Sequence, residues 1–525
     1  MVDLPQDEAP LVVLPHDYNA AVDLIERNLA AGRAGKTAFI DDRGAITYGE
    51  LARQVDRAAT AFRSLGIEPE QRVLLLLLDT IDFPVVFLGA IKAGIVPVPV
   101  NTLLTAADYD FMLRDSRARA VIVADALYDR LAPVLAKQPA LRHVIVAGGE
   151  GVSGRLNLSE LLAASEPHAK AAATTPDDAC FWLYSSGSTG APKGAVHLHA
   201  HLIHTAELYA KPVLGIAADD LVYSAAKLFF AYGLGNALTF PMAVGATTLL
   251  RAERPTPATV WRLLQDMRPT IFYGVPTLFA AMLASADAQR GSALALRRCV
   301  SAGEALPEDI GRRWTHLTGI EILDGLGSTE MLHIFLSNRP GAVRYGTTGV
   351  AVPGYALRLV DEAGEMVRDG EIGELQVAGP TSAIHYWNNR ARSRTTFLGE
   401  WTRSGDKYIR DPDGYYTYCG RTDDMLKVGG IYVSPFEVEA ALTTHVAVLE
   451  AAVVGHEDDS RLIKPRAFVV LRPGLAPSPA LAVELQDHVK ARLAPYKYPR
   501  WIEFIAELPK TATGKIQRFK LRDAS

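Results

Sequence analysis

A loop rich in glycine and hydroxyl residues follows an apolar run in the first half of the sequence. Residues 184–194 read YSSGSTGAPKG and come directly after CFWL. Small residues let successive backbone N–H groups turn toward an anion, hydroxyls can donate to it, and Lys193 adds a positive charge. The loop predicts a phosphate site, although an unliganded flexible loop is the alternative for this segment alone. Its spacing is not that of a Walker A loop, a GxGxxG turn or a G-x-S-x-G elbow.

A second chemical cluster closes the segment DGLGSTE at residues 324–330. Thr329 offers a hydroxyl to phosphate, and Glu330 offers a hard carboxylate oxygen of the kind that Mg²⁺ accepts beside substrate phosphates. Taken alone, Glu330 could equally be an acid in the first turn of a helix. Four more segments carry polar residues in tight, glycine-containing contexts: SAGEAL (301–306), TRSGD (402–406), GRTDDMLKVGG (420–430) and PKTATGKIQR (509–518).

In their order along the chain, the six segments resemble the acyl-adenylate-forming superfamily of acyl-CoA synthetases, adenylation domains and luciferases. The resemblance covers residues 184–518. It implies an α/β fold, with a large N-terminal lobe of layered α/β subdomains plus a β-rich unit and a small mobile α+β C-terminal lobe. The implied domains are 1–422 and 423–525, with a hinge at Asp423. The implied chemistry uses ATP, Mg²⁺ and CoA: a carboxylate forms acyl-AMP, and a thiol then displaces AMP.

The resemblance also implies roles for individual residues. Lys515 would bridge the carboxylate and the α-phosphate, Lys427 would face the site during thioester formation, and Thr329 and Glu330 would serve phosphate and Mg²⁺. Without its motif, Lys515 would be expected to be an ordinary surface lysine, and Asp406 or Arg421 a turn residue or surface ion-pair partner. The nucleotide-binding residues implied are Ser185, Ser186, Gly187, Ser188, Thr189, Gly190, Lys193, Gly303, Glu304 and Asp324, together with Asp406 and Arg421, which would hydrogen-bond the ribose hydroxyls.

Two segments are expected to form the walls of an acyl pocket. AAKLFFAYGLGN and the stretch after GSTE combine aromatic and small residues, which suggests a short flat slot for one ring and not for a long chain. These segments and APYKYPRWIEF resemble the benzoate–CoA ligase subgroup, so the expected substrate is a small aryl carboxylic acid. Ordinary core aromatics are the alternative. The predicted substrate-binding residues are Phe230, Ala231, Tyr232, Ala302, Gly327, Met331, His333 and Ile334.

Four histidines lie close together at 197, 199, 201 and 204. Spacings of three and four could place metal ligands on one helical face. No HExxH is present, and His199 fits a position of the resembled family. A metal site is therefore not predicted.

Two other functions stay open at this stage: loading of an aryl group onto a carrier protein, and nucleotide sensing without catalysis. A silent sensor would be free to lose catalytic residues, but this sequence keeps all four of them: Lys515, Lys427, Glu330 and Asp406. Four basic residues could contact CoA phosphates, but a solvated basic face is at least as well supported. They are Lys464, Arg466, Lys497 and Arg500.

Composition and charge favour a cytoplasmic protein that does not bind nucleic acid or acidic lipid. Lys+Arg 54 against Asp+Glu 59 gives a net charge of −5, so nucleic acid and acidic lipid surfaces are not expected partners. The three cysteines have no CxxC spacing, which favours a reducing cytoplasm. Residues 1–17 lack a basic start and an apolar core, so export is not expected. Charges interrupt the apolar stretch 73–100, which predicts strand, helix and strand and no membrane span.

Short apolar runs alternate with helical patterns and must position these motifs. VLLLLL (73–78), two VIVA runs (121–124 and 144–147), FWLY (181–184) and TTLL (247–250) predict strands of partly parallel sheets. Thr47 with Glu50 predicts a capped helix from Tyr48 to Leu65. Shorter strands and Gly/Asp turns from Gly341 predict a β-rich unit. AAVVG (451–455), AFVVL (467–471) and a helical pattern at 481–493 predict a separate terminal lobe.

Overall fold

The computed structural model describes residues 10–149, 151–187, 190–288, 294–422, 424–428, 431–458, 462–494, 496–510 and 516–523. The chain forms two compact units: residues 1–357 with 377–402, and residues 358–376 with 403–525. Both combine helices with sheets, which confirms the predicted α/β class. The second unit contains all of the predicted domain 423–525. The predicted boundary at Asp423 stays a prediction, because that residue lies outside the described part of the chain.

A five-stranded parallel sheet lies in the first unit, in the order β4-β3-β5-β6-β7. The stretch 73–100 forms strand, helix and strand, as predicted. Apolar runs fit such a sheet because both of its faces are covered. Helices α4 and α5 pack side chains into the same core. The elements are β3 (Arg72–Leu76), α3 (Asp82–Lys92), β4 (Val96–Pro99), α4 (Ala106–Ser116), β5 (Ala120–Ala124), α5 (Asp125–Leu135), β6 (His143–Ala147), β7 (Leu156–Asn157) and α6 (Leu158–Ala163).

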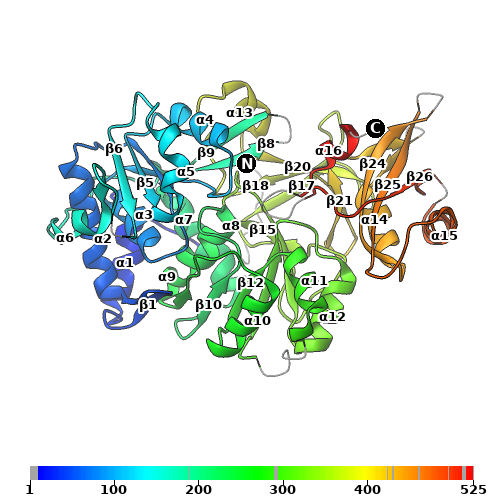
Figure 1. The fold of residues 1–525 in the computed structure, drawn as a ribbon, viewed down its shortest axis with the longest axis horizontal. Coiled ribbons are helices and arrows are strands. Elements are labelled where there is room, and N and C mark those ends of the chain that lie inside the picture. The colour runs from blue at the N-terminus through cyan, green and yellow to red at the C-terminus, as the bar shows by residue number, and fades with distance from the viewer. Residues whose placement is uncertain are drawn as a thin grey trace. The chain divides into compact units, whose positions relative to one another are not determined.

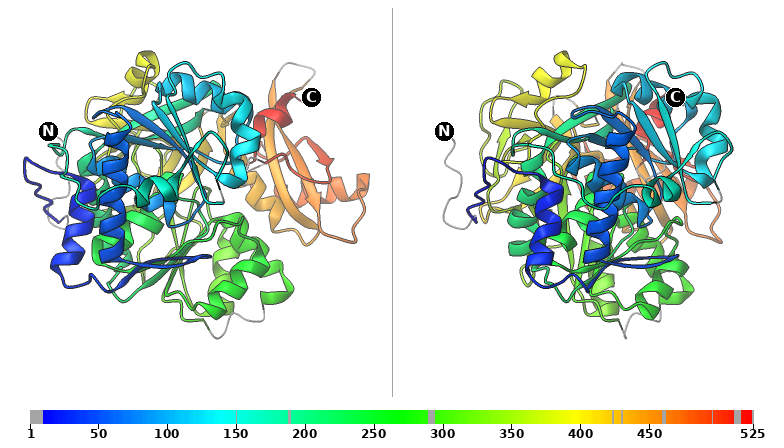
Figure 2. Two further views of the ribbon diagram at one scale, coloured as in Figure 1. Left: turned by 60° about the vertical axis from the view of Figure 1, so that its left-hand side comes forward. Right: turned by 90° about the vertical axis from the view of Figure 1, so that its left-hand side faces the viewer.

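Helices α1 (Ala20–Ala30) and α2 (Tyr48–Ser64) lie side by side, in dark blue in Figure 2. The Thr47 hydroxyl accepts the Glu50 backbone N–H at 3.2 Å, which caps the first turn of α2. The predicted start of this helix is confirmed, and its end differs by one residue. Leu51, Val55 and Phe62 fall on one face of α2 and are buried, as an amphipathic helix requires.

The second sheet of the first unit has nine strands, in the order β16-β15-β14-β13-β12-β10-β11-β1-β2. Its central strands are parallel, and helices α10, α11 and α12 contribute to one core with it (Figure 1). The elements are β1 (Thr37–Asp41), β2 (Gly44–Thr47), β10 (Leu221–Ser224), β11 (Thr247–Leu249), α10 (Pro257–Asp266), β12 (Ile271–Gly274), α11 (Pro276–Ala284), β13 (Arg298–Ala302), α12 (Glu308–Thr318), β14 (Ile322–Gly327), β15 (Ile334–Ser337) and β16 (Val350–Ala351).

An antiparallel hairpin carries the glycine- and serine-rich loop. Strand β8 (Ala179–Gly187) pairs with β9 (Gly190–Leu198), and Ser185 stands opposite Lys193. Trp182 and Val196 anchor the hairpin in the core of the five-stranded sheet. The chain then forms α7 (His199–Thr205), the π-helix η1 (Ala206–Leu214), α8 (Ala231–Leu234), the π-helix η2 (Gly235–Thr239) and α9 (Phe240–Val244).

Short strands follow Gly341, as predicted. They form a sheet of order β17-β18-β20-β19, with β21 paired to β20. Helix α13 directly precedes β19, the shortest strand of this sheet. The elements are β17 (Ala356–Val360), β18 (Gly373–Ala378), α13 (Arg390–Thr396), β19 (Phe397–Leu398), β20 (Trp401–Arg410) and β21 (Tyr416–Arg421).

The last sheet shows the two-residue period of a strand clearly. Ala451 and Val453 enter a core with α14 and α15, whereas Ala452 and Val454 enter a second core with Leu521 of α16. The strands and helices are seen in orange and red in Figure 1. Strands β22 (Leu426–Val428) and β23 (Ile431–Val433) pair with each other in a separate sheet. The strands of the last sheet are β24 (Val448–Glu457), β25 (Ile463–Leu471) and β26 (Trp501–Phe504), and the helices are α14 (Pro435–Thr443), α15 (Pro479–Lys490) and α16 (Arg518–Asp523). Among the described residues, no helix is both long and apolar enough to cross a bilayer.

Candidate active site

The carboxylate of Glu330 is held by two hydroxyl groups from distant segments. The Ser185 hydroxyl donates to Oε1 at 3.2 Å, and the Tyr386 hydroxyl donates to the same oxygen at 2.7 Å. Lys193 places its ammonium 4.8 Å from the centre of the Tyr386 ring. The structure therefore brings Ser185 and Lys193 of the β8–β9 hairpin close to the end of DGLGSTE and to Tyr386.

Sequence reasoning missed Tyr386. It lies in the segment HYWNN, which has no recognisable catalytic spacing, so only the tertiary contact reveals it. Tyr386 is 3% exposed, and burial, followed by the nearby Glu330 charge, raises the pKa of its phenol. The phenol therefore keeps its proton and acts as a fixed donor to Glu330.

Glu330 lies in a tight turn between β14 and β15. The Ser328 hydroxyl accepts the Met331 N–H at 3.1 Å, and the Thr329 carbonyl accepts the Leu332 N–H at 3.3 Å. Leu332 has φ 66°, a left-handed conformation that is uncommon for a residue with a β-carbon. The alternative that Glu330 is an acid in the first turn of a helix is thus excluded.

SAGEAL and DGLGSTE meet at one edge of the nine-stranded sheet. Strands β13 and β14 are parallel, with Ala302 opposite Gly325, so their carboxyl ends lie together. This edge is where parallel α/β sheets bind ligands. Gly303 follows β13 with φ +95°, and a β-carbon built there would meet no atom within 4 Å. Glycine is favoured at 303 by this backbone conformation.

The two predicted walls of the acyl pocket also meet. The rings of Tyr232 and His333 lie 5.7 Å apart, and His333 Nε2 is 3.1 Å from Asn236 Oδ1. Burial lowers the pKa of His333 to about 3, so its imidazole is neutral. Phe240 packs edge-on against His333 at 4.4 Å. Of the eight predicted residues, Phe230, Ala231, Tyr232 and Gly327 are half-buried, and Ala302, Met331, His333 and Ile334 are buried.

Asp324 is the first residue of DGLGSTE and lies on strand β14. It is 4% exposed, and burial raises the pKa of its carboxyl well above the usual range, against the lowering effect of the Leu306 and Gly325 N–H groups. Oδ1 of Asp324 and Nδ2 of Asn236 have no hydrogen-bond partner among the described residues. Buried polar atoms of this kind usually bind water or a ligand group. The nucleotide role of Asp324 stays a prediction.

The four clustered histidines are packed inside the first unit and not arranged around a metal. His199 Nδ1 accepts the Ala20 N–H at 3.1 Å and so fixes the start of α1. Desolvation lowers the pKa of all four side chains. Within the described part of the chain, no group of three or more His, Cys, Asp or Glu side chains could hold a metal ion.

The predicted ribose-binding residues are adjacent in the second unit. Asp406 on β20 stands opposite Arg421 on β21, and Arg421 Nη1 donates to Asp406 Oδ1 at 2.9 Å. Arg421 is 46% exposed on its side chain, so the pair can still reach a ligand. The ion-pair alternative is therefore present, and the ribose role stays a prediction.

Several predicted residues cannot be placed in full. Ser188, Thr189, Asp423 and Lys515 lie outside the described residues. Ser186, Gly187 and Gly190 belong to the β8–β9 hairpin, and Lys427 belongs to β22, but only their backbones are described. Glu304 is half-buried after β13. Their predicted roles, including that of Thr329, remain predictions.

Three of the four candidate cations for CoA have partners within the chain. Arg466 pairs with Glu503, Lys497 Nζ lies 2.6 Å from Glu437 Oε2, and Arg500 stacks 3.6 Å above the Tyr498 ring. Lys464 is half-buried in β25. These contacts give three of the four cations partners within the chain and give no support for a CoA phosphate site here.

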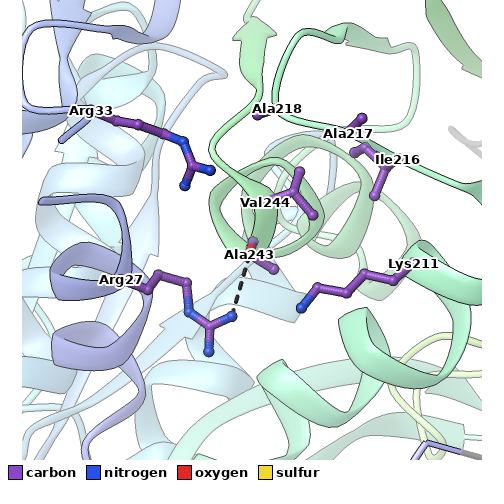
Figure 3. A pocket seen from close by; sticks show the side chains of 8 residues that line it. All are labelled: Arg27, Arg33, Lys211, Ile216, Ala217, Ala218, Ala243 and Val244. Atoms are coloured by element: carbon purple, nitrogen blue, oxygen red, sulfur yellow. Dashed lines mark hydrogen bonds between the residues drawn. The ribbon is translucent and has the colours of Figure 1, made fainter. Parts of the chain in front are cut away.

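A separate surface pocket of about 510 Å³ lies in the first unit (Figure 3). Three basic side chains line it, but Asp23 neutralises Arg27 and Glu207 neutralises Lys211. It includes none of the predicted site residues. Its lining consists of Arg27, Arg33, Lys211, Ile216, Ala217, Ala218, Ala243 and Val244.

The parallel sheet edge, the hairpin that carries the predicted phosphate loop and the Glu330 turn fit a nucleotide-using α/β enzyme. The chain belongs to the AMP-binding enzyme family: residues 26–387 match the model of that family, and residues 437–515 match that of the AMP-binding enzyme C-terminal domain. The predicted superfamily, with its large N-terminal and small C-terminal parts, is confirmed.

Individual relatives extend over the whole chain. It is 62% identical to a benzoate–CoA ligase of Thauera aromatica, over 98% of both chains. A crystal structure of a benzoate CoA ligase from Burkholderia xenovorans is similar with a TM-score of 0.89 and 58% identity, covering 96% of this chain and 100% of that one. An anthranilate CoA ligase solved with anthranoyl-AMP is similar with a TM-score of 0.93 and 44% identity, covering 97% and 98%.

Proposed function

We propose that this chain is an AMP-forming benzoate–CoA ligase. A carboxylate oxygen of benzoate attacks the α-phosphorus of ATP, the α–β anhydride bond breaks, and pyrophosphate leaves. The CoA sulfur then attacks the carbonyl carbon of benzoyl-AMP, AMP leaves with the bonding electrons, and the thiol proton passes to solvent. Activation is needed because a free carboxylate would have to expel oxide, whereas AMP is a good leaving group.

The observation that carries this proposal is the 62% identity to a benzoate–CoA ligase over 98% of both chains. The local geometry supports it. The ring contact of Tyr232 with His333 places two predicted pocket walls together, and Glu330 faces the hairpin that carries the predicted phosphate loop. No observation favours carrier-protein loading or a silent sensor. The cytoplasm, which supplies ATP and CoA, is the expected location, and the three cysteines are buried free thiols.

The residues present fit a magnesium ion that arrives with ATP. Tyr386 and Ser185 both donate to Oε1 of Glu330. Within the described residues, the other carboxylate oxygen, Oε2, accepts no hydrogen bond. Mg²⁺ commonly uses one or two carboxylates and completes its coordination with phosphate oxygens and water. When bound, the ion would neutralise phosphate charge during adenylation. Glu330 is the residue that would hold it.

Substrate choice should follow from the predicted acyl pocket, which is expected to bury one aromatic ring. Loss of that ring forfeits about 2–3 kcal/mol of apolar burial. Benzoate should therefore be preferred over acetate, over long-chain fatty acids and over benzoates with bulky para substituents. AMP release measured with a panel of aryl and alkyl acids, with and without CoA, tests this expectation. A kcat/KM for octanoate comparable to that for benzoate would contradict it, and AMP release independent of CoA would favour another acceptor.

The two half-reactions can be separated by variants of the predicted C-terminal lobe. Lys515→Ala should lose benzoyl-AMP formation yet still convert supplied benzoyl-AMP and CoA to thioester. Asp423→Pro should restrict the hinge and, if it locks the adenylating state, preserve the first step while suppressing the second. Equal loss of both steps in Asp423→Pro, or failure of Lys515→Ala with supplied benzoyl-AMP, would refute the hinge assignment.

A further inference from the structure

A buried histidine contacts the turn that carries Thr329 and Glu330. His197 Nε2 lies 2.8 Å from the backbone carbonyl oxygen of Thr329. The imidazole is 0% exposed and stacks on Phe181 with ring centres 5.2 Å apart, so its plane is fixed. His197 and Thr329 are 132 residues apart in the sequence.

The protonation of this imidazole follows from its neighbours. Burial lowers the pKa of His197 to about 4, so near neutral pH the ring carries one proton. A carbonyl oxygen can only accept, so the 2.8 Å contact requires that proton on Nε2. Nδ1 of His197 then carries no proton and lies 3.0 Å from His201 Nδ1. That His201 nitrogen also lies 3.3 Å from the Leu198 backbone N–H.

The turn needs such support because it contains a strained residue. Leu332, at φ 66°, has a left-handed backbone conformation that persists only where neighbouring contacts fix it. From one side the turn is held by the 381–386 segment: the Thr381 hydroxyl donates to the Met331 carbonyl at 2.8 Å, and the Ala383 N–H donates to the Glu330 carbonyl at 2.7 Å. His197 adds a further contact to the turn through the Thr329 carbonyl.

We propose that His197 is a positioning residue for adenylation: its Nε2–H bond to the Thr329 carbonyl fixes the turn so that Glu330 and the Thr329 hydroxyl face the nucleotide. This inference rests on the proposed function. The imidazole is 0% exposed, so it has no surface that a substrate could touch. It acts on the reaction solely through the placement of the turn.

Two substitutions separate hydrogen bonding from packing. His197→Phe keeps an aromatic ring beside Phe181 but has no donor, whereas His197→Gln can present an amide N–H where Nε2 lies. The matched control is His143→Phe, because His143 Nε2 makes the same kind of bond, 2.9 Å from the Leu65 carbonyl, at a place outside the predicted site. Benzoate-dependent ATP–pyrophosphate exchange and its Mg²⁺ dependence are measured for all four proteins.

His197→Phe should lower the maximal exchange rate on the order of tenfold and raise the Mg²⁺ concentration for half-maximal rate, while the KM for benzoate stays unchanged. His197→Gln should recover most of the rate, and His143→Phe should match the parent. Equal kinetics for His197→Phe and His143→Phe would overturn the proposal. So would a folded His197→Gln protein that is as slow as His197→Phe.

A measurement independent of activity tests the same contact. In ¹⁵N-histidine-labelled protein, the resonances lost in His197→Phe identify this imidazole, and its nitrogen shifts show which nitrogen carries the proton. We expect protonated Nε2 and unprotonated Nδ1 at neutral pH. The reverse tautomer would refute the inference even in an active enzyme. Absence of exchange with every aryl acid in the parent protein would instead refute the proposed function and leave this result standing.

Discussion

Replacement of Tyr386 by phenylalanine should weaken magnesium-dependent adenylation. The substitution removes one hydroxyl, which donates to Glu330 Oε1 at 2.7 Å. Ser185 would remain as a donor to that oxygen, at the longer distance of 3.2 Å. The carboxylate would then have to be oriented at the moment when the metal and ATP bind, and not beforehand.

The size of the effect follows from the kind of bond that is lost. A hydrogen bond to a charged group is worth about 1.5–3 kcal/mol, which corresponds to a loss of about 10- to 150-fold. Because the bond fixes the proposed Mg²⁺ ligand, most of the loss should appear as a higher Mg²⁺ concentration for half-maximal pyrophosphate exchange. The KM for benzoate should change little.

A matched control exists elsewhere in the same unit. The Tyr18 hydroxyl donates to Asp23 Oδ2 at 2.8 Å and is similarly buried, so Tyr18→Phe removes the same kind of bond away from the predicted site residues. Tyr18→Phe should leave the Mg²⁺ dependence unchanged. Tighter or unchanged Mg²⁺ dependence in Tyr386→Phe would show that Glu330 is not held for the metal in this way.

Three further outcomes are expected. Glu330→Gln should keep the fold but greatly reduce ATP-dependent adenylation, and unchanged activity at limiting Mg²⁺ would remove Glu330 from the site. Arg518→Met should destabilise the second unit by about 3–5 kcal/mol, because it leaves buried Glu439 without the arginine that binds it at 2.8 Å. The double variant Arg518→Met with Glu439→Gln should recover much of this loss in urea denaturation. Absence of recovery would refute the pairing argument. Burial lowers the pKa of His199 from 6.5 to about 4 in the folded protein. Between these two pH values the unfolded chain is protonated at His199 and the folded chain is not, so the free energy of unfolding decreases as the pH falls from 6.5 towards 4. The stability advantage of the parent over His199→Asn should therefore shrink by about 2 kcal/mol between pH 7.5 and pH 5, and a constant difference would contradict the assignment.

Local patterns in the sequence determined the elements and the family. Thr47 and Glu50 predicted the start of α2, because a cap depends on residues three apart. Apolar runs predicted β3, β5 and β6, because strands buried on both faces need continuous hydrophobicity. The six ordered motifs predicted an adenylate-forming enzyme, and the family matches confirmed it.

Only the tertiary structure decided how the candidate site is held together. The partners of Glu330 lie 56 and 145 residues away, and the histidine on the Thr329 carbonyl lies 132 residues away. No local period relates such positions, because sheet order and register bring them together. The same holds for Asp406 and Arg421, which became neighbours through the pairing of β20 with β21. Sequence thus supplied the reactive groups, and long-range packing supplied the contacts that fix their orientation.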